Sequence, residues 1–563
     1  MAFIAAPSSG SALVLLKPKD FALFSGLAEP SRWSLPAALA EHAAQQPNSV
    51  WVTTTEGEAL TFGEAAADAA RVAGWLEALG VERGETVAVM MGSTLDFIRV
   101  WLGLQYRGAV GVLLNTELSG AFLEHQLANC GCAFAIADAT LAPRVVAASP
   151  QAPALRRLAV VARPGAPAEA VAMGTLEAVP FTDWQQAAPV ALALPAGQDI
   201  ACIMYTSGTS GPAKGVLMPY RHCALYGIGT LKSVELTAAD RYYITLPLFH
   251  VNGLFMQLGA TLLAGTVAII RERFSATEWL NDVRRHGATV TNNLGALAAF
   301  VAATPPAAND REHSLRVVQN APNVPELERV FRERFGVPHV TSGFGMTEVN
   351  IPIWGRVGHS TPGAAGWVHE EHFEVIIADP ETDLPVPRGG LGEILVRPKI
   401  AGGFMAGYHG MPEKTVEAWR NLWFHTGDAG IMDATGLVTF VDRLKDCIRR
   451  RGENIAANEV EFAVAGLPGV AEVAAFAVPS DLLGGEDELM LAVVAVPGSG
   501  FDPLAFAAAA DALLPRFARP RYVEVVEALP KTATGKVQRA VLRKRGSANA
   551  LDRGEPQRRV KTP

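Results

Sequence analysis

The sequence predicts an α/β protein with a large N-terminal domain of several layers and mainly parallel sheets, a β-rich subdomain, and a small α+β domain at the C-terminus. Three observations lead to this prediction. Strand and helix patterns alternate from about residue 60 to residue 345, glycine-punctuated strands follow residue 389, and a compact unit follows residue 446. Alternation of this kind is typical of parallel sheets, whose strands are joined by helical crossovers. At 563 residues the chain is too long for one ordinary core.

The alternating region begins with a strand end and an amphipathic helix over residues 60–81. Further strand or helix patterns occupy residues 85–91, 93–110, 133–139, 241–247, 265–272, 276–287, 288–294, 327–336 and 337–345. The alanine- and proline-rich segment between residues 150 and 198 is expected to run along the surface.

The C-terminal third has a different texture. Residues 390–398 and 436–443 are predicted to be antiparallel strands, and residues 447–530 contain their own helices and strands. We therefore expect domains at 1–444 and 446–545. The basic, proline-ended tail at 546–563 is expected to be disordered.

Composition narrows the class of protein. Hydrophobic residues make up 49% of the chain and charged residues 18%, which fits a well-packed globular enzyme. The formal net charge of -8 disfavours a nucleic-acid binder, which normally carries a basic excess. The sequence contains no apolar run of the roughly 18 residues that cross a bilayer, and its first residues resemble a secretory signal poorly. Five scattered cysteines suit a reducing compartment, so we expect buried structural thiols and a cytoplasmic protein.

The stretch YTSGTSGPAKG, Tyr205 to Gly215, has the composition of a polyphosphate-binding loop. Glycines let backbone N–H groups converge on an anion, and hydroxyls and one lysine add donors. The residues expected to bind are Thr206, Ser207, Gly208, Thr209, Ser210, Gly211 and Lys214. A mobile linker is the alternative interpretation. A phosphate-loop NTPase is disfavoured, because Lys214 is followed by Gly215 and not by Ser or Thr.

Seven stretches in this order resemble the adenylate-forming (AMP-binding) superfamily, and most closely its ATP-dependent acyl-CoA synthetases. They are the loop above, PLFHVNG (247–253), GFGMTE (343–348), GEILVR (392–397), WFHTGD (423–428), DRLKDCIRRRGENI (442–455) and PKTATGK (530–536). The resemblance spans roughly residues 60 to 545. It implies an enzyme that joins a carboxylate to the α-phosphate of ATP, releases pyrophosphate, and then transfers the acyl group to CoA.

The resemblance also implies roles for individual residues in adenylation. Thr347 is expected to bind the α-phosphate, and Glu348 is expected to hold Mg2+, a hard cation that prefers oxygen ligands. Asp428 and Arg443 are expected at the ribose. Lys536 is expected to stabilise the negative charge of the transition state. The alternative for Thr347 and Glu348 is a helix cap, and for Asp428 a turn aspartate.

The adenine site implied by the resemblance lies between a small-residue segment and an aromatic residue. Its residues here are Asn320, Ala321, Pro322, Phe344 and Gly345. Gln319 and Asn320 replace the glycines usual before Ala-Pro, so the adenine contacts depart from the family pattern.

Acyl transfer is implied by the region after residue 442. In the acyl-CoA synthetases the small domain is mobile and rotates after adenylation, with Lys445 here as the hinge. Gly452 is expected to line the pantetheine tunnel, and Arg451 to lie at it; a solvated strand face is an equal interpretation of the three consecutive arginines.

The acid itself is less constrained by the sequence. His250 stands where amino-acid-activating relatives carry an aspartate, so an amino acid is disfavoured, and His250 is expected to gate the site or orient the carboxylate. Gly295 and Ala296 are small, which favours a medium-sized or bulky acid. The expected lining residues are Val251, Asn252, Leu294, Gly295, Gly343, Val349 and Asn350.

The expected cofactors and substrates are ATP, Mg2+, coenzyme A and a small carboxylic acid. Three alternatives stay open at this point. The acceptor could be the phosphopantetheine of a carrier protein, the chain could form a homodimer, and a non-catalytic nucleotide-binding homologue is the alternative to an enzyme.

Overall fold

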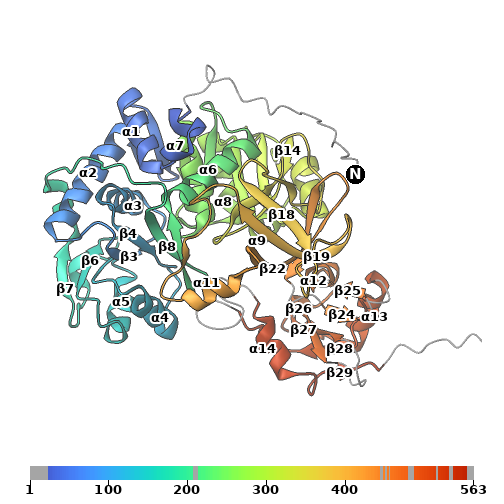
Figure 1. Ribbon diagram of the computed structural model, residues 1–563. Coiled ribbons are helices and arrows are strands. Elements are labelled where there is room, and N and C mark those ends of the chain that lie inside the picture. Colours follow the sequence, from blue (N-terminus) through green and yellow to red (C-terminus); the bar gives the residue numbers. More distant parts are fainter. Residues whose placement is uncertain are drawn as a thin grey trace, which may run out of the picture.

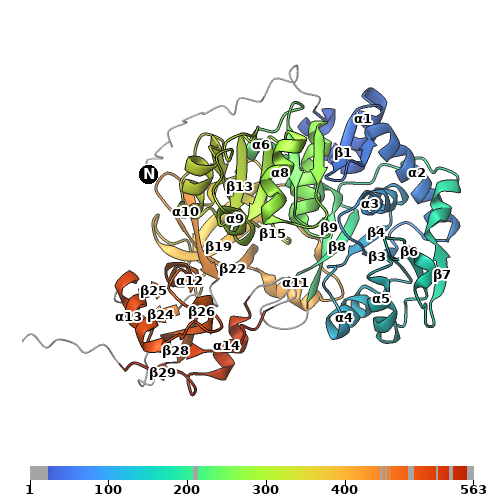
Figure 2. The same ribbon diagram turned by 180° about the vertical axis from the view of Figure 1, so that it is seen from behind.

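The computed structural model describes residues 23–206, 213–443, 448–450, 453–455, 457–479, 487–514, 518–531 and 537–554. Three large sheets and their helices form the part of the chain up to residue 443, and a separate unit at one end of the molecule follows (Figures 1 and 2). The predicted fold class is therefore confirmed.

The first sheet is parallel over most of its width and buried on both faces. Its strands are, in spatial order, β20 (Gly407–Tyr408), β9 (Lys214–Pro219), β8 (Ile200–Thr206), β4 (Val110–Leu113), β3 (Thr86–Met90), β5 (Phe134–Asp138), β6 (Arg157–Val161) and β7 (Glu177–Pro180). Only β9 and β20 run antiparallel to their neighbours. Alternate residues of β3 and β5 enter two different hydrophobic clusters, as the two-residue period of a strand requires.

Helices cover both faces of this sheet. The helices α2 (Phe62–Ala78) and α3 (Leu95–Arg107) pack against one face, whereas α4 (Gly120–Cys130) and α5 (Ala142–Ala148) pack against the other. The start of α2 is fixed by Thr61 and Glu64, whose side chains and backbone N–H groups bond reciprocally in a capping box.

The second sheet is also mainly parallel. Its strands are β14 (His339–Thr341), β13 (Val317–Ala321), β12 (Val290–Leu294), β10 (Arg241–Ile244), β11 (Val267–Ile270), β1 (Val50–Thr54) and β2 (Ala59–Thr61). One face packs against α6 (Tyr220–Val234) and α7 (Gly259–Ala264); the other packs against α8 (Ala276–His286), α9 (Gly295–Ala302) and α10 (Pro325–Arg329). The helix α1 (Leu35–Gln45) lies beside α7 and α2.

The third sheet is antiparallel throughout, as predicted for the β-rich region. It contains β15 (Gly343–Met346), β16 (Asn350–Trp354), β17 (Gly366–Val368), β23 (Leu437–Arg443), β22 (Trp423–Met432), β19 (Leu391–Pro398) and β18 (Phe373–Ala378), with β21 (Trp419–Arg420) beside β22. The helix α11 (Pro412–Ala418) follows β20. Short irregular helices are η2 (Ser25–Ala28), η3 (Pro30–Arg32), η4 (Ser149–Gln151), η5 (Ala168–Ala170), η6 (Phe181–Gln186) and the π-helical η7 (Asn252–Leu258) and η8 (Val330–Arg334).

The C-terminal unit has its own core. Its strands are β24 (Ile448–Arg450), β25 (Glu453–Ile455), β26 (Val470–Pro479), β27 (Asp487–Ala495), β28 (Tyr522–Val525) and β29 (Leu551–Asp552). The four-stranded sheet β26–β29 lies between α12 (Ala457–Ala465) with α13 (Pro503–Leu513) on one face and α14 (Arg539–Arg545) on the other.

Two sequence-based expectations differ from the structure. Residues 157–161 and 177–180 do not simply run along the surface, because they form β6 and β7 and extend the first sheet. Phe181 and Trp184 after them are buried, and the ring of Phe181 lies 5.8 Å from that of Trp75. A few apolar residues in a proline-rich segment are enough to anchor it.

The expected disorder of 546–563 is wrong for residues 546–554. The strand β29 pairs with β28, and Arg553 forms hydrogen bonds of 2.9 and 2.5 Å with the Asp511 carboxylate. Arg553, one of the basic residues that predict a solvated tail, forms an ion pair with Asp511 instead. Residues 555–563 lie outside the described part of the chain.

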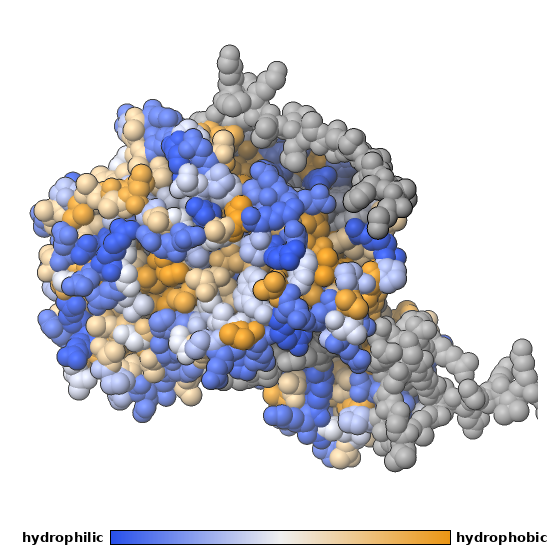
Figure 3. Space-filling model, in the orientation of Figure 1, coloured by the Kyte–Doolittle hydropathy of each residue, from blue (hydrophilic) through white to orange (hydrophobic). Residues whose placement is uncertain are grey.

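The prediction of buried structural thiols is confirmed for the four cysteines among the described residues. Cys130, Cys132, Cys202 and Cys223 are buried free thiols, whereas Cys447 lies outside the described residues. In the described residues, no helix is long and apolar enough to span a bilayer. Hydrophilic residues are spread over the face drawn in Figure 3, with groups of hydrophobic residues between them.

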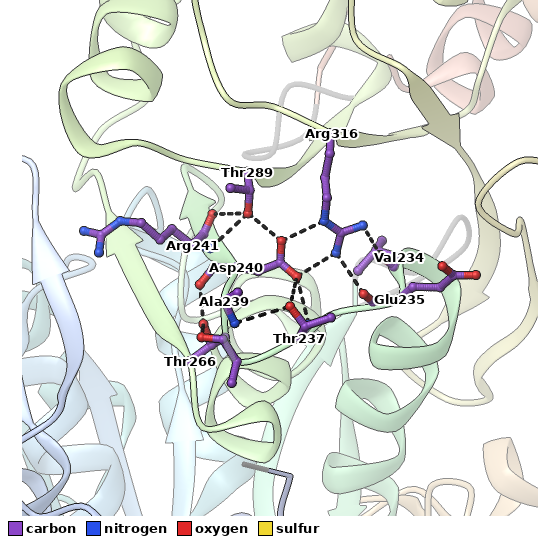
Figure 4. Close-up of polar contacts among 10 residues, drawn as sticks. Val234, Glu235, Thr237, Ala239, Asp240, Arg241, Thr266, Thr289 and Arg316 are labelled. Atoms are coloured by element: carbon purple, nitrogen blue, oxygen red, sulfur yellow. Dashed lines mark hydrogen bonds and ion pairs between the residues drawn. The ribbon is translucent and has the colours of Figure 1, made fainter. Parts of the chain in front are cut away.

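A buried ionic network joins the second sheet to α6 (Figure 4). The Asp240 carboxylate accepts two hydrogen bonds of 2.7 Å from Arg316, one of 2.7 Å from Thr289 and two from Thr237. Arg316 also donates to the carbonyls of Val234 and Glu235, at the end of α6. Burial would raise the pKa of Asp240, but these donors hold it below its ordinary value.

Asp240→Asn tests this network. A carboxyl whose pKa is lower in the folded state stabilises the fold above its unfolded pKa of about 3.9, and that contribution is lost as the pH falls through the folded pKa. We expect the substitution to lower the free energy of unfolding by about 2–3 kcal/mol at neutral pH, because Arg316 loses its partner. Chemical denaturation measures the difference, which should shrink below a pH of about 4.

The exposed Asp183→Asn serves as the control and should change the free energy of unfolding little. An equal effect of the two substitutions, or a difference for Asp240→Asn that is constant with pH, would contradict this account.

Candidate active site

The ends of the predicted phosphate loop are fixed by a hairpin. The strands β8 and β9 are antiparallel and pair Thr206 with Lys214, so the two ends of the loop lie side by side. On the other side of β9, β20 pairs Tyr408 with Val216. Ser207, Gly208, Thr209, Ser210 and Gly211 lie outside the described residues.

The Glu348 carboxylate lies against this hairpin. It is buried, and its Oε1 accepts hydrogen bonds from Thr206 Oγ1 at 3.3 Å and from the Tyr408 hydroxyl at 2.9 Å. A buried carboxylate requires such donors, because leaving water without them is costly. Two residues predicted from separate motifs, Thr206 and Glu348, are therefore in direct contact.

Tyr408 also links Glu348 to the lysine of the loop. Lys214 Nζ lies 4.2 Å from the centroid of the Tyr408 ring, within the range of a cation–π interaction. Burial, together with the charge of Glu348, raises the pKa of Tyr408 above its ordinary value. Tyr408 therefore keeps its proton and donates a hydrogen bond to the carboxylate.

Thr347 and Glu348 lie in a tight turn between β15 and β16, where the Val349 N–H donates to the Met346 carbonyl at 3.2 Å. The turn is followed by a strand, so the helix-cap interpretation is wrong. Asn350 closes the turn with a φ of 68°, a left-handed conformation that asparagine tolerates better than most residues.

The helix α6 holds the backbone of this turn. The Tyr226 hydroxyl donates to the Met346 carbonyl at 2.7 Å, and His222 Nε2 lies 2.9 Å from the Thr347 carbonyl oxygen. These two residues are four apart and so share one face of the helix. His222 is fully buried, and burial lowers its pKa to about 4, so the ring is neutral near pH 7. The turn is therefore attached to α6 through the uncharged side chains of His222 and Tyr226.

Two glycines of β15, which precedes this turn, differ in the space available for a side chain. A Cβ at Gly345 would lie 2.3 Å from the Asn350 carbonyl oxygen, so no side chain fits there without moving the backbone. A Cβ at Gly343 would make ordinary contacts, the nearest at 3.4 Å. Gly345 is thus required by the close approach of β15 to β16.

The predicted ribose residues lie on neighbouring strands. Asp428 in β22 pairs with Arg443 in β23, and Asp428 is buried at 6% exposure. Its N–H donates to Thr426 Oγ1 at 3.1 Å, and Thr426 in turn donates to the Ile394 carbonyl. Asp428 is therefore held by a strand and not by an isolated turn. The side chain of Arg443 lies outside what the structure describes.

The predicted adenine residues lie on β13 and β15, two neighbouring elements. Asn320 is fully buried, and its Oδ1 accepts a hydrogen bond from Asn293 at 3.3 Å. Pro322 follows Ala321 through a cis peptide bond. The Phe344 ring stacks against Phe440 at 5.8 Å, so one of its faces is covered by the protein.

A chain of amide side chains, buried at Asn292 and Gln319 and partly buried at Asn252, connects two of the predicted acyl-pocket residues. Asn252 Oδ1 accepts from Gln257 at 2.9 Å and from Asn292 at 3.1 Å, and Asn292 donates also to Gln319 Oε1 at 3.1 Å. A Cβ placed on Gly343 would lie 3.5 Å from Gln319 Nε2. Asn252 and Gly343 thus lie at the two ends of a polar wall that the sequence did not predict.

The other predicted pocket residues are less uniform. Leu294 is 45% exposed. A Cβ on Gly295 would meet Pro322 at 3.1 Å, so this glycine adjoins the adenine segment and does not face open space. The Ala296 side chain is not described.

Val349 and Asn350 are buried within the fold. Val349 belongs to the main hydrophobic cluster, and Asn350 Nδ2 donates to the His222 carbonyl at 2.9 Å. We therefore no longer assign either residue to the acyl pocket.

His250 and Val251 lie just before the π-helical turn η7. Both are partly exposed, and the His250 ring lies 4.6 Å from that of Phe249. A Cβ on Gly253 would lie 2.4 Å from the Pro247 carbonyl oxygen, so the PLFHVNG segment closes tightly on itself. Turns of this π-helical type occur frequently at functional sites.

Lys536, Lys445, Arg451 and Gly452 all lie outside the described residues. Lys531 and Val537, which flank the segment of Lys536, form an isolated antiparallel bridge. The ends of that segment are therefore held together.

Sequence reasoning did not identify Tyr408, His222 or Tyr226. Tyr408 lies in a strand of two residues, too short to show a period. His222 and Tyr226 act on backbone carbonyls, which leave no motif in the sequence. A four-residue spacing of two polar aromatic residues in an apolar helix was the only available signal.

Comparisons with known proteins identify the family of the chain. The AMP-binding enzyme family model matches residues 39–409, and the model of the AMP-binding enzyme C-terminal domain matches residues 459–536. The chain is similar to a medium/long-chain-fatty-acid–CoA ligase of Mycobacterium marinum, at 30% identity over 87% of this chain and 91% of the relative. It is also similar to a sulfoacetate–CoA ligase of Cupriavidus necator, at 32% identity over 90% of this chain and 97% of the relative.

A solved structure, the anthranilate CoA ligase in complex with anthranoyl-AMP, matches with a TM-score of 0.80 at 25% identity. The match covers 93% of this chain and 99% of that one. The resemblance therefore extends over both the large domain and the C-terminal unit.

Tyr408→Phe tests the contact between the loop hairpin and Glu348. The change removes one hydroxyl donor to a buried carboxylate, and hydrogen bonds to charged groups contribute about 1.5–3 kcal/mol. We expect carboxylate-dependent exchange of pyrophosphate into ATP to fall by tenfold or more, because 1.4 kcal/mol corresponds to a factor of about ten.

Tyr220→Phe is the matched control, since this buried tyrosine donates to the Gln105 carbonyl and not to the site. Unchanged exchange in Tyr408→Phe, or an equal loss in both variants, would rule out a role for the Tyr408 hydroxyl.

Proposed function

The chain belongs to the AMP-binding enzyme family and is an AMP-forming acyl-CoA ligase, and from this premise we propose how its residues divide the reaction and which acids it accepts. In the first step a carboxylate oxygen attacks the α-phosphorus of ATP, forming acyl-AMP and releasing pyrophosphate. In the second step the CoA thiol attacks the acyl carbon and AMP leaves. The observation that carries the proposal is the contact of Glu348 with Thr206 and Tyr408.

Glu348 is proposed to hold Mg2+ beside the phosphates. Both of its described hydrogen bonds fall on Oε1, and its neighbours Thr206 and Tyr408 present oxygen atoms. Such a hard-oxygen surrounding fits magnesium, which would neutralise phosphate charge when bound. The loop from Thr206 to Lys214 would enclose the β- and γ-phosphates, and Thr347 would donate to the α-phosphate.

Asp428 and Arg443 are proposed to bind the ribose, and the Asn320–Pro322 segment with Phe344 and Gly345 the adenine. The pairing of Asp428 with Arg443 supports the first assignment. A carboxylate with two oxygens can accept hydrogen bonds from both ribose hydroxyls.

The second half-reaction is proposed to need the C-terminal domain in another orientation. Lys445 would act as the hinge, and Gly452 and Arg451 would line the path of the pantetheine arm. Purified protein should release AMP when CoA is added to its acyl-adenylate. A release that requires carrier-protein phosphopantetheine would assign the carrier as acceptor, and adenylate formation without release to either thiol would overturn the transfer step.

Two lysines should separate the half-reactions. Lys536→Ala should slow adenylate formation by roughly a hundredfold, on the scale of about 3 kcal/mol for one electrostatic donor, yet still convert a supplied acyl-adenylate with CoA. Lys445→Pro should do the opposite, because a fixed φ restricts the hinge. Single-turnover assays of each step measure both. Equal loss of both steps in both variants would exclude domain alternation.

The acid is proposed to be of medium size and to carry a hydrogen-bonding substituent away from its carboxylate. Similar ligases are named for fatty acids and for sulfoacetate, so family membership alone does not select the acid. The polar wall formed by Asn252, Asn292 and Gln319 supports a polar substituent. The buried Oδ1 of Asn292 and Oε1 of Gln257 have no hydrogen-bond partner among the described residues. Leaving buried amides unpaired is costly, so a substituent that pairs with them is favoured.

Gln319→Leu tests this wall, and we expect it to invert the preference within matched pairs such as 4-hydroxycinnamate and cinnamate. A site built to bond a hydroxyl rejects the analogue that lacks it, because buried polar groups are then left unpaired. The ratio of kcat/KM values for the pair should fall by at least tenfold. Asn281→Leu, at an exposed site on α8, is the control. A wild-type preference for plain alkyl acids would refute the polar-substituent proposal while leaving the ligase reaction intact.

A further inference from the structure

Two buried histidines and a glutamate form a cluster outside the site described above. His369, Glu371 and His372 lie between β17 and β18, and one ligand atom of each lies within 4.8 Å of the others. His369 Nε2 is 3.8 Å from Glu371 Oε2, and His372 Nε2 is 3.9 Å from Glu371 Oε1. These distances are too long for direct hydrogen bonds.

The two imidazoles are buried, and most of their nitrogens lack a hydrogen-bond partner among the described residues. His369 is 5% exposed and His372 is 3% exposed. His369 Nδ1 and Nε2 and His372 Nε2 have no partner in the described part of the chain. Buried polar atoms are normally paired, so three orphan nitrogens in one place require an explanation.

Tryptophan side chains pack against both imidazole rings. The His369 ring lies 3.7 Å from that of Trp354, and the His372 ring lies 5.0 Å from that of Trp33. The backbone is held as well, since the His369 N–H donates to the Pro352 carbonyl at 2.8 Å and the Lys399 N–H donates to the His372 carbonyl at 2.8 Å. The two rings are therefore held by packing, whereas Glu371, whose side chain is 53% exposed and pairs with Lys232, is less confined.

We propose that His369, Glu371 and His372 form a Zn2+ site with a fourth position open to solvent. Imidazole and carboxylate are ordinary zinc ligands, and three protein ligands plus water complete a tetrahedral shell. Zinc–ligand bonds of about 2.1 Å place tetrahedral ligands about 3.4 Å apart, whereas the ligand atoms of this cluster lie within 4.8 Å of one another, so zinc binding requires them to draw together by up to about 1.4 Å.

The electrostatics support neutral ligands. Burial lowers the pKa of His369 to about 3 and that of His372 to about 4, so both imidazoles keep their lone pairs near pH 7. Nitrogen ligands also disfavour Mg2+, so the cluster is chemically distinct from the carboxylate of Glu348.

Lys232 is the natural competitor for this site. Its ammonium donates to Glu371 Oε2 at 2.5 Å from α6. A zinc ion must share or displace this cation at the carboxylate. Removing the lysine charge should therefore tighten zinc binding, an effect that a site elsewhere in the chain would not show.

The experiment titrates Co2+, and then Zn2+ in competition, into tag-free full-length protein in excess Mg2+. Wild type should bind one equivalent with the visible spectrum of four-coordinate cobalt and should gain thermal stability with Zn2+. Glu371→Gln should weaken binding at least tenfold, and Lys232→Met should tighten it. Glu370→Gln changes the adjacent exposed carboxylate and should bind as wild type does.

His369→Ala removes a ring stacked on Trp354 and could unfold the strand, so the conclusion depends on the Glu371 and Lys232 variants. Absence of bound metal, equal affinity of Glu371→Gln and Glu370→Gln, or weaker binding by Lys232→Met would overturn the site. A thiolate-to-cobalt absorption would do the same, because it would assign the metal to the buried Cys130 and Cys132 pair.

Discussion

The organisation of the candidate active site depends on one buried carboxylate. Glu348 lies in the turn between β15 and β16 of the third sheet. Its carboxylate accepts hydrogen bonds from hydroxyls on β8 and β20 of the first sheet. Neither sheet alone satisfies its charge, and leaving it unpaired would cost several kcal/mol. The two sheets are therefore held in one relative position at the two ends of the predicted phosphate loop.

The same position is fixed from behind by α6. This helix follows β9 and so carries the hairpin of the phosphate loop, while its His222 and Tyr226 contact the carbonyls of Thr347 and Met346. Its far end is held by Arg316, which binds Asp240 of the second sheet and the last carbonyls of the helix. All three sheets thus meet on one helix, and a displacement of α6 would move the loop and Glu348 together.

The sequence was sufficient for the features that short motifs encode. Alternating strands and helices predicted the parallel sheets, and the loop composition and the GFGMTE stretch singled out Thr206, Lys214 and Glu348, which lie at one hairpin. What the sequence could not show is how distant segments meet. Tyr408 lies about two hundred residues after Lys214, and its position beside that lysine follows only from the pairing of β20 with β9.

The wrong predictions share a physical cause. Residues 157–180 and 546–554 were judged by composition, whereas a few specific contacts decide whether a polar segment is ordered. Val349 and Asn350 were expected among the lining residues of the acyl pocket. The left-handed turn at Asn350 directs its side chain to α6, and a backbone φ of this kind cannot be inferred from neighbouring residues alone.

The strand β16 connects two buried polar groups, of which one has hydrogen-bond partners in the described residues and the other has none. At its start, the turn places Glu348 where two hydroxyls pair with its charge. At its end, the Trp354 ring contacts that of His369, whose nitrogens have no hydrogen-bond partner in the described residues. Trp354 also packs against α6 at Gly229, where a Cβ would lie 3.1 Å from the ring. Hydroxyl groups of the protein pair with the Glu348 carboxylate. The buried His369 nitrogens are expected to be paired as well, and an external ligand is the simplest partner for them.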